Sequence, residues 1–67
     1  MTLGELIKNK RMESCMSQSE LALRCKVSRY QVIRWESDRA KPRPANVGLL
    51  AKSLGLQPSE IVSLIFK

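Results

Sequence analysis

Helix-start signals constrain this chain more than any other feature, because five of them fall within 67 residues. Residues 2–5 (TLGE) and 17–20 (SQSE) each place a hydroxyl cap three residues before a glutamate, which is the pattern of a capping box. Ser28 is a third cap, while Pro44 and Pro58 suit the first turn of a fourth and a fifth helix. Since no segment alternates with the period of a strand, the sequence predicts a compact all-α fold of five helices.

Apolar residues at helical spacing extend each signal into an amphipathic helix. The first helix is expected over about residues 3–14, and Gly55 is expected to end the fourth. Only Lys26 and Val27 separate the second helix from the Ser28 cap, so these two helices are expected to meet at a tight turn. The expected inward-facing residues are Leu3, Leu6, Ile7, Leu21, Ala22, Cys25, Val32, Trp35, Glu36, Val47, Leu50, Ala51, Leu54, Ile61, Leu64 and Ile65.

Length and composition limit the chain to one small core. A domain of this size buries only about 60% of the surface that its unfolded chain exposes, so residues 1–67 are expected to form a single domain. With 43% hydrophobic residues the chain is too apolar for a disordered tail. No apolar run reaches the length of about 18 residues that a membrane span needs, and no secretory signal is present. We therefore expect a soluble, cytoplasmic domain.

Residues that carry catalytic or metal chemistry are few. Cys15 and Cys25 are ten residues apart and the chain has no histidine, so the spacings of a zinc site or a redox pair are absent. Cys25 continues the apolar side of the second helix and is expected to be a buried, reduced thiol. Without histidine, a glycine-rich phosphate loop or a carboxylate pair in apolar surroundings, no enzymatic activity, metal, cofactor or small-molecule ligand is expected.

Positive charge is concentrated in the middle of the chain. The net charge is +6, of which +5 lies in residues 23–44. Clustered cations attract polyanions such as nucleic acid, although a basic surface can also serve solubility alone. The cations of this segment are Arg24, Lys26, Arg29, Arg34, Arg39, Lys41 and Arg43, against Glu36 and Asp38.

The third helix has two different sides. Val32 and Trp35 share one face, because residues three apart lie together on a helix. A helix of about 10 to 12 Å diameter fits the roughly 12 Å major groove of B-DNA, so the other face is predicted to meet double-stranded DNA. Solvated charges and ion pairs within the helix are the alternative reading. This second face carries Arg29, Tyr30, Ile33, Arg34 and Ser37.

Side-chain chemistry assigns roles on that face. Arg29, at the leading end, is expected to donate two hydrogen bonds to guanine. Tyr30 is expected to bond a base or a phosphate, and Ile33 to pack on a thymine methyl group. Arg34, further along, is expected to reach a base or the backbone. These four residues form the predicted base-reading set.

Phosphate contacts are expected on both sides of the third helix. An exposed helix start presents free N–H groups that bind phosphate, and the second helix starts next to Ser17 and Gln18. The basic loop after the third helix suits the flanking DNA backbone, a merely solvated loop being the alternative. The predicted phosphate-binding residues are Ser17, Gln18, Ser28, Arg39, Lys41 and Arg43.

The order of these motifs resembles the helix-turn-helix of the lambda-repressor-like, Cro-type (Xre-type) family. The similarity is carried by residues 16–36 (MSQSELALRCKVSRYQVIRWE) and 50–56 (LAKSLGL), and it runs without gaps over residues 3–61. It implies a five-helix DNA-binding domain whose helix-turn-helix spans about residues 17–37 and whose third helix enters the major groove.

The resemblance also implies an ion pair between Arg11 and Glu36, which would join the first and third helices. The family usually has glycine at three positions that here hold Cys15, Lys26 and Asp38. A left-handed backbone costs a non-glycine residue about 1 kcal/mol or more, so strained or reshaped turns are expected at Cys15 and Lys26. Aspartate adopts this conformation more easily.

A single reading helix makes few base contacts, and such domains usually dimerise on two half-sites about 34 Å apart. The predicted homodimer interface consists of Val62, Ile65 and Phe66 near the end of the chain. Val62 and Phe66 lie off the apolar stripe that closes the core, and an exposed apolar patch favours association. Packing of Phe66 against the first helix is the alternative.

These features predict a transcription regulator that acts by occupying an operator, because 67 residues hold no second domain for an inducer. A small phage-type, Cro-like repressor fits best, in the cytoplasm or nucleoid of a bacterial or phage-infected cell. Activation and the control of a short chromosomal operon are left open at this stage, and a fragment of a longer repressor would look the same. The rival reading is a protein-interaction module of the same fold, such as an antitoxin or a coactivator.

Overall fold

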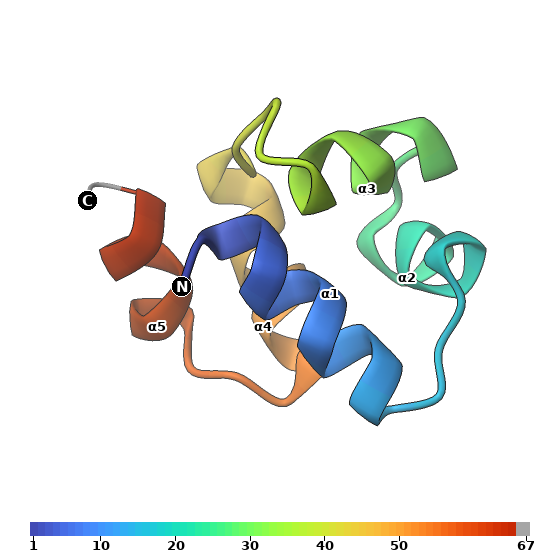
Figure 1. Ribbon diagram of the computed structural model, residues 1–67, viewed down its shortest axis with the longest axis horizontal. Coiled ribbons are helices and arrows are strands. Elements are labelled where there is room, and N and C mark those ends of the chain that lie inside the picture. The colour runs from blue at the N-terminus through green and yellow to red at the C-terminus, as the bar shows by residue number, and fades with distance from the viewer. Residues whose placement is uncertain (66–67) are drawn as a thin grey trace.

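The structure is a computed structural model that describes residues 1–65, and over that range it contains five helices and no strand (Figure 1). The helices are α1 (Leu3–Glu13), α2 (Gln18–Cys25), α3 (Arg29–Glu36), α4 (Pro44–Leu54) and α5 (Pro58–Ile65). The prediction of an all-α, five-helix fold is confirmed, with α1 ending one residue earlier than expected. None of these helices is long and apolar enough to cross a membrane.

Local hydrogen bonds cap the first three helices at the positions that the sequence predicts. The Thr2 hydroxyl accepts the backbone N–H of Glu5 at 3.2 Å, and the Glu5 carboxylate accepts the N–H of Thr2 at 3.1 Å. Ser17 and Glu20 repeat this reciprocal pair at the start of α2, and the Ser28 hydroxyl caps α3. These bonds satisfy N–H groups that the start of a helix otherwise leaves free.

The helices α2 and α3 lie at one end of the molecule and α5 lies at the other, with α1 and α4 between them (Figure 1). Apolar side chains from all five helices meet in one core, so no element folds apart from the rest. The largest fully buried side chains are Trp35, Ile7, Leu21, Leu50, Ile61, Val32 and Cys25.

The core differs from the expected set at a few positions. Met16, which was not expected there, is also buried, and two bonds to Arg11 hold its backbone against α1. Cys25 is fully buried as expected, and burial raises the pKa of its thiol, although a hydrogen bond with Ser53 partly lowers it. Four residues that were expected to face inward are only half-buried, namely Leu6, Glu36, Leu64 and Ile65.

Within residues 1–65, three residues other than glycine adopt the left-handed backbone conformation. Cys15, Lys26 and Asp38 have φ angles of 54°, 58° and 61°. These are the positions where the resembling family usually has glycine. The turns therefore keep the geometry that glycine favours and accept the steric cost of a Cβ atom, instead of being reshaped.

Candidate nucleic-acid interface

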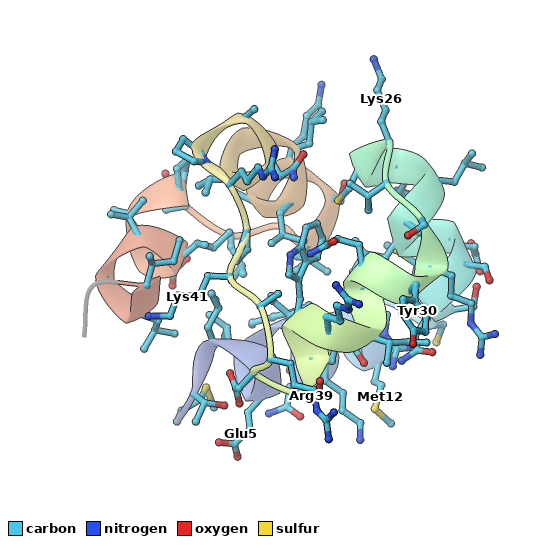
Figure 2. All side chains as sticks on the ribbon, turned by 90° about the horizontal axis from the view of Figure 1, so that it is seen from above. Glu5, Met12, Lys26, Tyr30, Arg39 and Lys41 are labelled. Carbon is cyan, nitrogen blue, oxygen red and sulfur yellow. The ribbon has the colours of Figure 1, made fainter. Side chains whose placement is uncertain are left out.

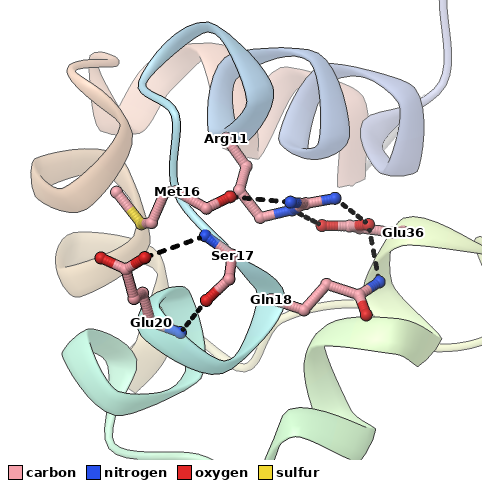
Figure 3. Close-up of polar contacts among 6 residues, drawn as sticks. All are labelled: Arg11, Met16, Ser17, Gln18, Glu20 and Glu36. Atoms are coloured by element: carbon pink, nitrogen blue, oxygen red, sulfur yellow. Dashed lines mark hydrogen bonds and ion pairs between the residues drawn. The ribbon is translucent and has the colours of Figure 1, made fainter.

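An ion pair between Arg11 of α1 and Glu36 of α3 holds the two helices together (Figure 3). The Arg11 Nε donates to Glu36 Oε2 at 2.6 Å, and Nη2 donates to Oε1 at 3.2 Å. The third nitrogen, Nη1, donates to the backbone carbonyl of Met16 at 2.8 Å. With exposed side-chain fractions of 12% and 6%, the pair is largely removed from water, so its orientation is well defined.

Gln18 of α2 joins the same carboxylate. Its Nε2 donates to Glu36 Oε1 at 3.1 Å, so one carboxylate links α1, α2 and α3 (Figure 3). Sequence reasoning expected Gln18 at a phosphate and missed this contact, because nothing in the spacing of residues 18 and 36 signals it. The bond leaves the Gln18 carbonyl oxygen and its second amide hydrogen for other partners.

Gly4 brings the start of α1 close to the end of α3. Its N–H donates to Asp38 Oδ1 at 2.9 Å. A Cβ atom added at Gly4 would lie 2.6 Å from the carbonyl oxygen of Glu36 and 2.7 Å from that of Trp35. Only glycine fits this approach, so Gly4 sets the distance between α1 and α3. Sequence reasoning also missed this residue, since a glycine inside a capping box has no evident role.

Three open depressions surround α3, and together they are lined by every residue predicted to contact DNA. The first, of about 460 Å³, lies between the starts of α2 and α3 and includes Ser17, Gln18 and Arg29. The second, of about 330 Å³, includes Tyr30, Ile33, Arg34 and Arg39. The third, of about 430 Å³, includes Ser28, Arg34, Lys41 and Arg43. No aspartate or glutamate lines any of the three.

The side chains on the outer face of α3 differ in exposure. Tyr30 is 66% exposed, Arg29 and Arg34 are also exposed, and Ile33 is half-buried. The Arg34 guanidinium lies 5.1 Å from the centre of the Tyr30 ring, a cation–π distance. Arg34 and Tyr30 therefore present one joint surface, and Figure 2 shows Tyr30 standing out from the α3 ribbon.

Lys41 is placed differently from the other loop cations. Its Nζ donates to the backbone carbonyl of Ile65 at 2.9 Å, and Figure 2 shows its side chain beside α5. Cations are favourable at the end of a helix, where carbonyl groups lack intrahelical partners. This exposed bond directs the Lys41 side chain toward α5 and uses one of its three N–H donors.

Two of the predicted dimer residues, Val62 and Ile65, lie on α5, at the opposite end of the molecule from α3 (Figure 1). Val62 is 39% exposed, Ile65 is half-buried, and Phe66 lies outside the described residues. Val62 and Ile65 line a depression of about 320 Å³ that they share with Pro42, Pro44 and Val47. All five lining residues are apolar, which separates this surface from the basic depressions around α3.

Comparisons with known proteins agree with this geometry. A family model described as helix-turn-helix matches residues 7–61, whereas no curated protein sequence matches the chain significantly. The crystal structure of the P22 c2 repressor in complex with a synthetic operator is 26% identical, with a TM-score of 0.88 over 91% of this chain and 92% of that one. The solution structure of the DNA-binding domain of the P22 c2 repressor is also 26% identical, with a TM-score of 0.86 over 92% and 82% of the two chains. The chain thus belongs to the lambda-repressor-like (Xre-type) helix-turn-helix family.

Proposed function

We propose that the protein is a DNA-binding transcription regulator that reads duplex DNA by placing α3 in the major groove. The observation that carries this proposal is the set of three depressions around α3, which among the described residues are lined by no acidic side chain and by five cations besides Arg11, whose charge is paired with Glu36. A surface of this kind attracts a polyanion over its whole extent. The operator complex of the similar P22 c2 repressor supports the same partner class.

The base-reading roles follow from position on α3. Arg29 is the first residue of the helix and its side chain is exposed, which suits a bidentate contact with guanine. Ile33 is half-buried between Tyr30 and Arg34, so it suits the methyl group of thymine. The proposed base-reading residues are Arg29, Tyr30, Ile33 and Arg34.

The phosphate-binding roles follow from the two flanks of α3. On one side, Ser17 and Gln18 begin α2 beside Arg29, where the start of the helix favours an anion. On the other side, the loop after α3 carries the remaining cations. The proposed phosphate-binding residues are Ser17, Gln18, Ser28, Arg39, Lys41 and Arg43, which position the protein without specifying sequence.

The regulator is proposed to be a Cro-like repressor that acts by occupying an operator as a homodimer. The apolar depression containing Val62 and Ile65 supports the dimer, because all its lining residues are apolar and none of them lines the three basic depressions. Phe66, outside the described residues, is proposed to belong to the same interface. Two copies would then read two half-sites about one helical turn apart.

The DNA-binding proposal is tested by selecting bound sequences from a pool of random duplexes across a salt series. Wild type, Arg29→Ala and Arg24→Ala are compared. Arg29→Ala is expected to lose preference at one position in each half-site and about 1 to 3 kcal/mol of specific binding. Arg24→Ala is the matched control, since it removes the same charge from an exposed position on α2 that lines none of the three depressions. Equal specificity in all three proteins would reject the base-reading role.

The dimer proposal needs a separate test. Val62→Glu is expected to abolish cooperative binding to a two-fold symmetric site while leaving binding to a single half-site unchanged. Ser59→Glu puts the same charge on α5 outside the apolar depression and serves as the control. If wild type shows no sequence preference and Val62→Glu instead loses a protein partner, the protein-interaction reading replaces the DNA reading.

A further inference from the structure

Trp35 contains an unsatisfied polar atom in the core. The residue is 1% exposed, and its Nε1 has no hydrogen-bond partner among the described residues. A buried donor without a partner carries the full penalty of its desolvation, so it points to a water, ion or ligand that satisfies it. Packing alone does not explain a tryptophan here, because a phenyl ring buries similar apolar surface without that penalty.

Trp35 lines the third depression, which lies between α3, the loop of residues 37–43 and the start of α4. Its volume of about 430 Å³ leaves room for an anionic group together with water. Arg34, Lys41 and Arg43 line it as cations and no acidic residue does, so the cavity favours an anion over a cation.

The start of α4 adds to this preference. Arg43 makes no side-chain cap bond at this helix, whereas Thr2, Ser17 and Ser28 cap the first three helices. Asn46, in the first turn of α4, also lines the depression, so the positive end of the helix dipole borders it.

We propose that one phosphate of the DNA backbone occupies this depression and accepts a hydrogen bond from Trp35 Nε1. The proposal rests on the proposed function and assigns a residue that sequence reasoning placed only in the core. A phosphate oxygen accepts hydrogen bonds and cannot donate them, which matches a lone N–H among cations. The flexible side chains of Gln31, Lys41 and Arg43 line the same space and move aside to admit the oxygen, a rotamer change that is common at interfaces.

A bond from Trp35 to a phosphate would affect how α3 contacts the bases. The surface arginines and lysines are long and mobile, whereas the Trp35 ring is buried in the core, on the side of α3 that packs against α1 and α2. A phosphate held by a fixed donor on α3 itself sets how deep the helix lies in the groove. Trp35 is therefore a positioning residue, and it acts on the base contacts through the orientation of α3.

The test combines Trp35→Phe, which keeps an aromatic ring but removes the N–H, with duplexes that carry one neutral methylphosphonate at each backbone position in turn. On unmodified DNA the variant is expected to bind about 10-fold more weakly than wild type. At one position per half-site, wild type is expected to lose more on modification than Trp35→Phe, because both proteins lose the attraction of the lining cations and only wild type also loses the bond from Nε1. Equal losses for both proteins at every position would overturn the proposal.

A second measurement covers the case in which Trp35→Phe folds poorly. Trp35 is the only tryptophan of the chain, so its indole N–H gives a single assigned proton resonance. We expect a downfield shift of this resonance with unmodified operator DNA and a smaller one when the critical phosphate is neutral. An unchanged resonance on specific DNA binding would overturn this inference alone, whereas absence of specific binding would reject the proposed function. An equal shift with inorganic phosphate at the same concentration would assign the site to a free anion and overturn the DNA assignment.

Discussion

The two ends of this molecule are held together by different interactions. At the α3 end, directional contacts fasten the helix, through the Glu36 carboxylate to Arg11 and Gln18 and through Asp38 to the N–H of Gly4. At the α5 end, the buried Ile61 anchors the helix through apolar packing, and the bond that ties its last turn to the loop is exposed.

This difference matches what each end has to do. Apolar burial is non-directional and lets two surfaces adjust to each other, whereas charge-assisted hydrogen bonds fix one geometry. A helix that reads base edges needs its orientation fixed before it binds, because its donors must meet fixed acceptors in the groove. A surface that contacts a second copy of the chain needs no such fixed geometry, because apolar side chains on both copies can adjust to each other. The α3 end is therefore expected to be the less tolerant of change.

The largest effect is expected from Glu36→Gln. This change leaves the Arg11 guanidinium charged and mostly buried without its counterion, which costs about 3 to 5 kcal/mol. A domain of this length has a total stability of roughly 3 to 10 kcal/mol, so the variant is expected to lose a large part of it. Urea denaturation followed by far-UV circular dichroism measures the change in the free energy of unfolding.

The Lys10–Glu13 pair provides the control for Glu36→Gln. Its atoms are 3.5 Å apart but its side chains are 37% and 65% exposed, so Glu13→Gln is expected to cost about 1 kcal/mol or less. If both variants unfold at the same urea concentration, the Arg11–Glu36 pair stabilises the fold no more than an exposed pair does.

Gly4→Ala tests the close approach between α1 and α3. The added methyl group would meet the backbone carbonyls of Trp35 and Glu36, which cannot move aside as a flexible side chain would. Overpacking of this kind costs about 1 to 3 kcal/mol, and the displaced α3 is expected to bind specific DNA more weakly. Gly48→Ala is the matched control, since a Cβ there meets nothing within 4 Å and removing glycine from a helix gains about 0.5 to 1 kcal/mol. Gly4→Ala is expected to lower the free energy of unfolding and Gly48→Ala to raise it. A change in the same direction in both variants would contradict the close approach at Gly4.

Much of the fold was predictable because its signals are local. Capping boxes join residues that are three apart in the sequence, so the starts of α1 and α2 can be predicted from the sequence alone. The link from Gln18 to Glu36 and the approach at Gly4 depend on how helices cross, which no short motif encodes. The unpaired Nε1 of Trp35 could not be predicted either. Helical periodicity places the ring in the core but does not indicate whether its N–H finds a partner.

The proposed DNA contacts could be named from the sequence for a related reason. Exposed cations and caps around one helix are a property of residue type and helical phase, and the structure brings these residues around α3. The sequence could not foresee which cations already have partners. Lys41 and Arg43 look alike in the stretch from residue 39 to 43 (RAKPR), yet only Lys41 is seen bonding to α5.

Ile61→Val probes the apolar end by removing one methyl group from a fully buried side chain. The expected cost is about 0.5 to 1.5 kcal/mol, from lost burial and a small cavity. Because packing is non-directional, DNA affinity measured where the variant is fully folded is expected to equal that of wild type. A loss of specific binding in this variant would show that the two ends are coupled and would remove the contrast between them.

The smallest effect on stability is expected from Lys41→Met, since exposed substitutions usually change the free energy of unfolding by about 0.5 kcal/mol or less. Arg43→Met removes the same charge from the same loop and has no bond to α5 among the described contacts, so the difference between the two variants isolates the bond to Ile65. If Lys41 turns to a phosphate on binding, both variants lower the salt slope of DNA binding by about 1. If only Arg43→Met lowers the salt slope of DNA binding, Lys41 instead remains bonded to the end of α5 when DNA is bound. In that case the basic loop would belong partly to the apolar end of the molecule.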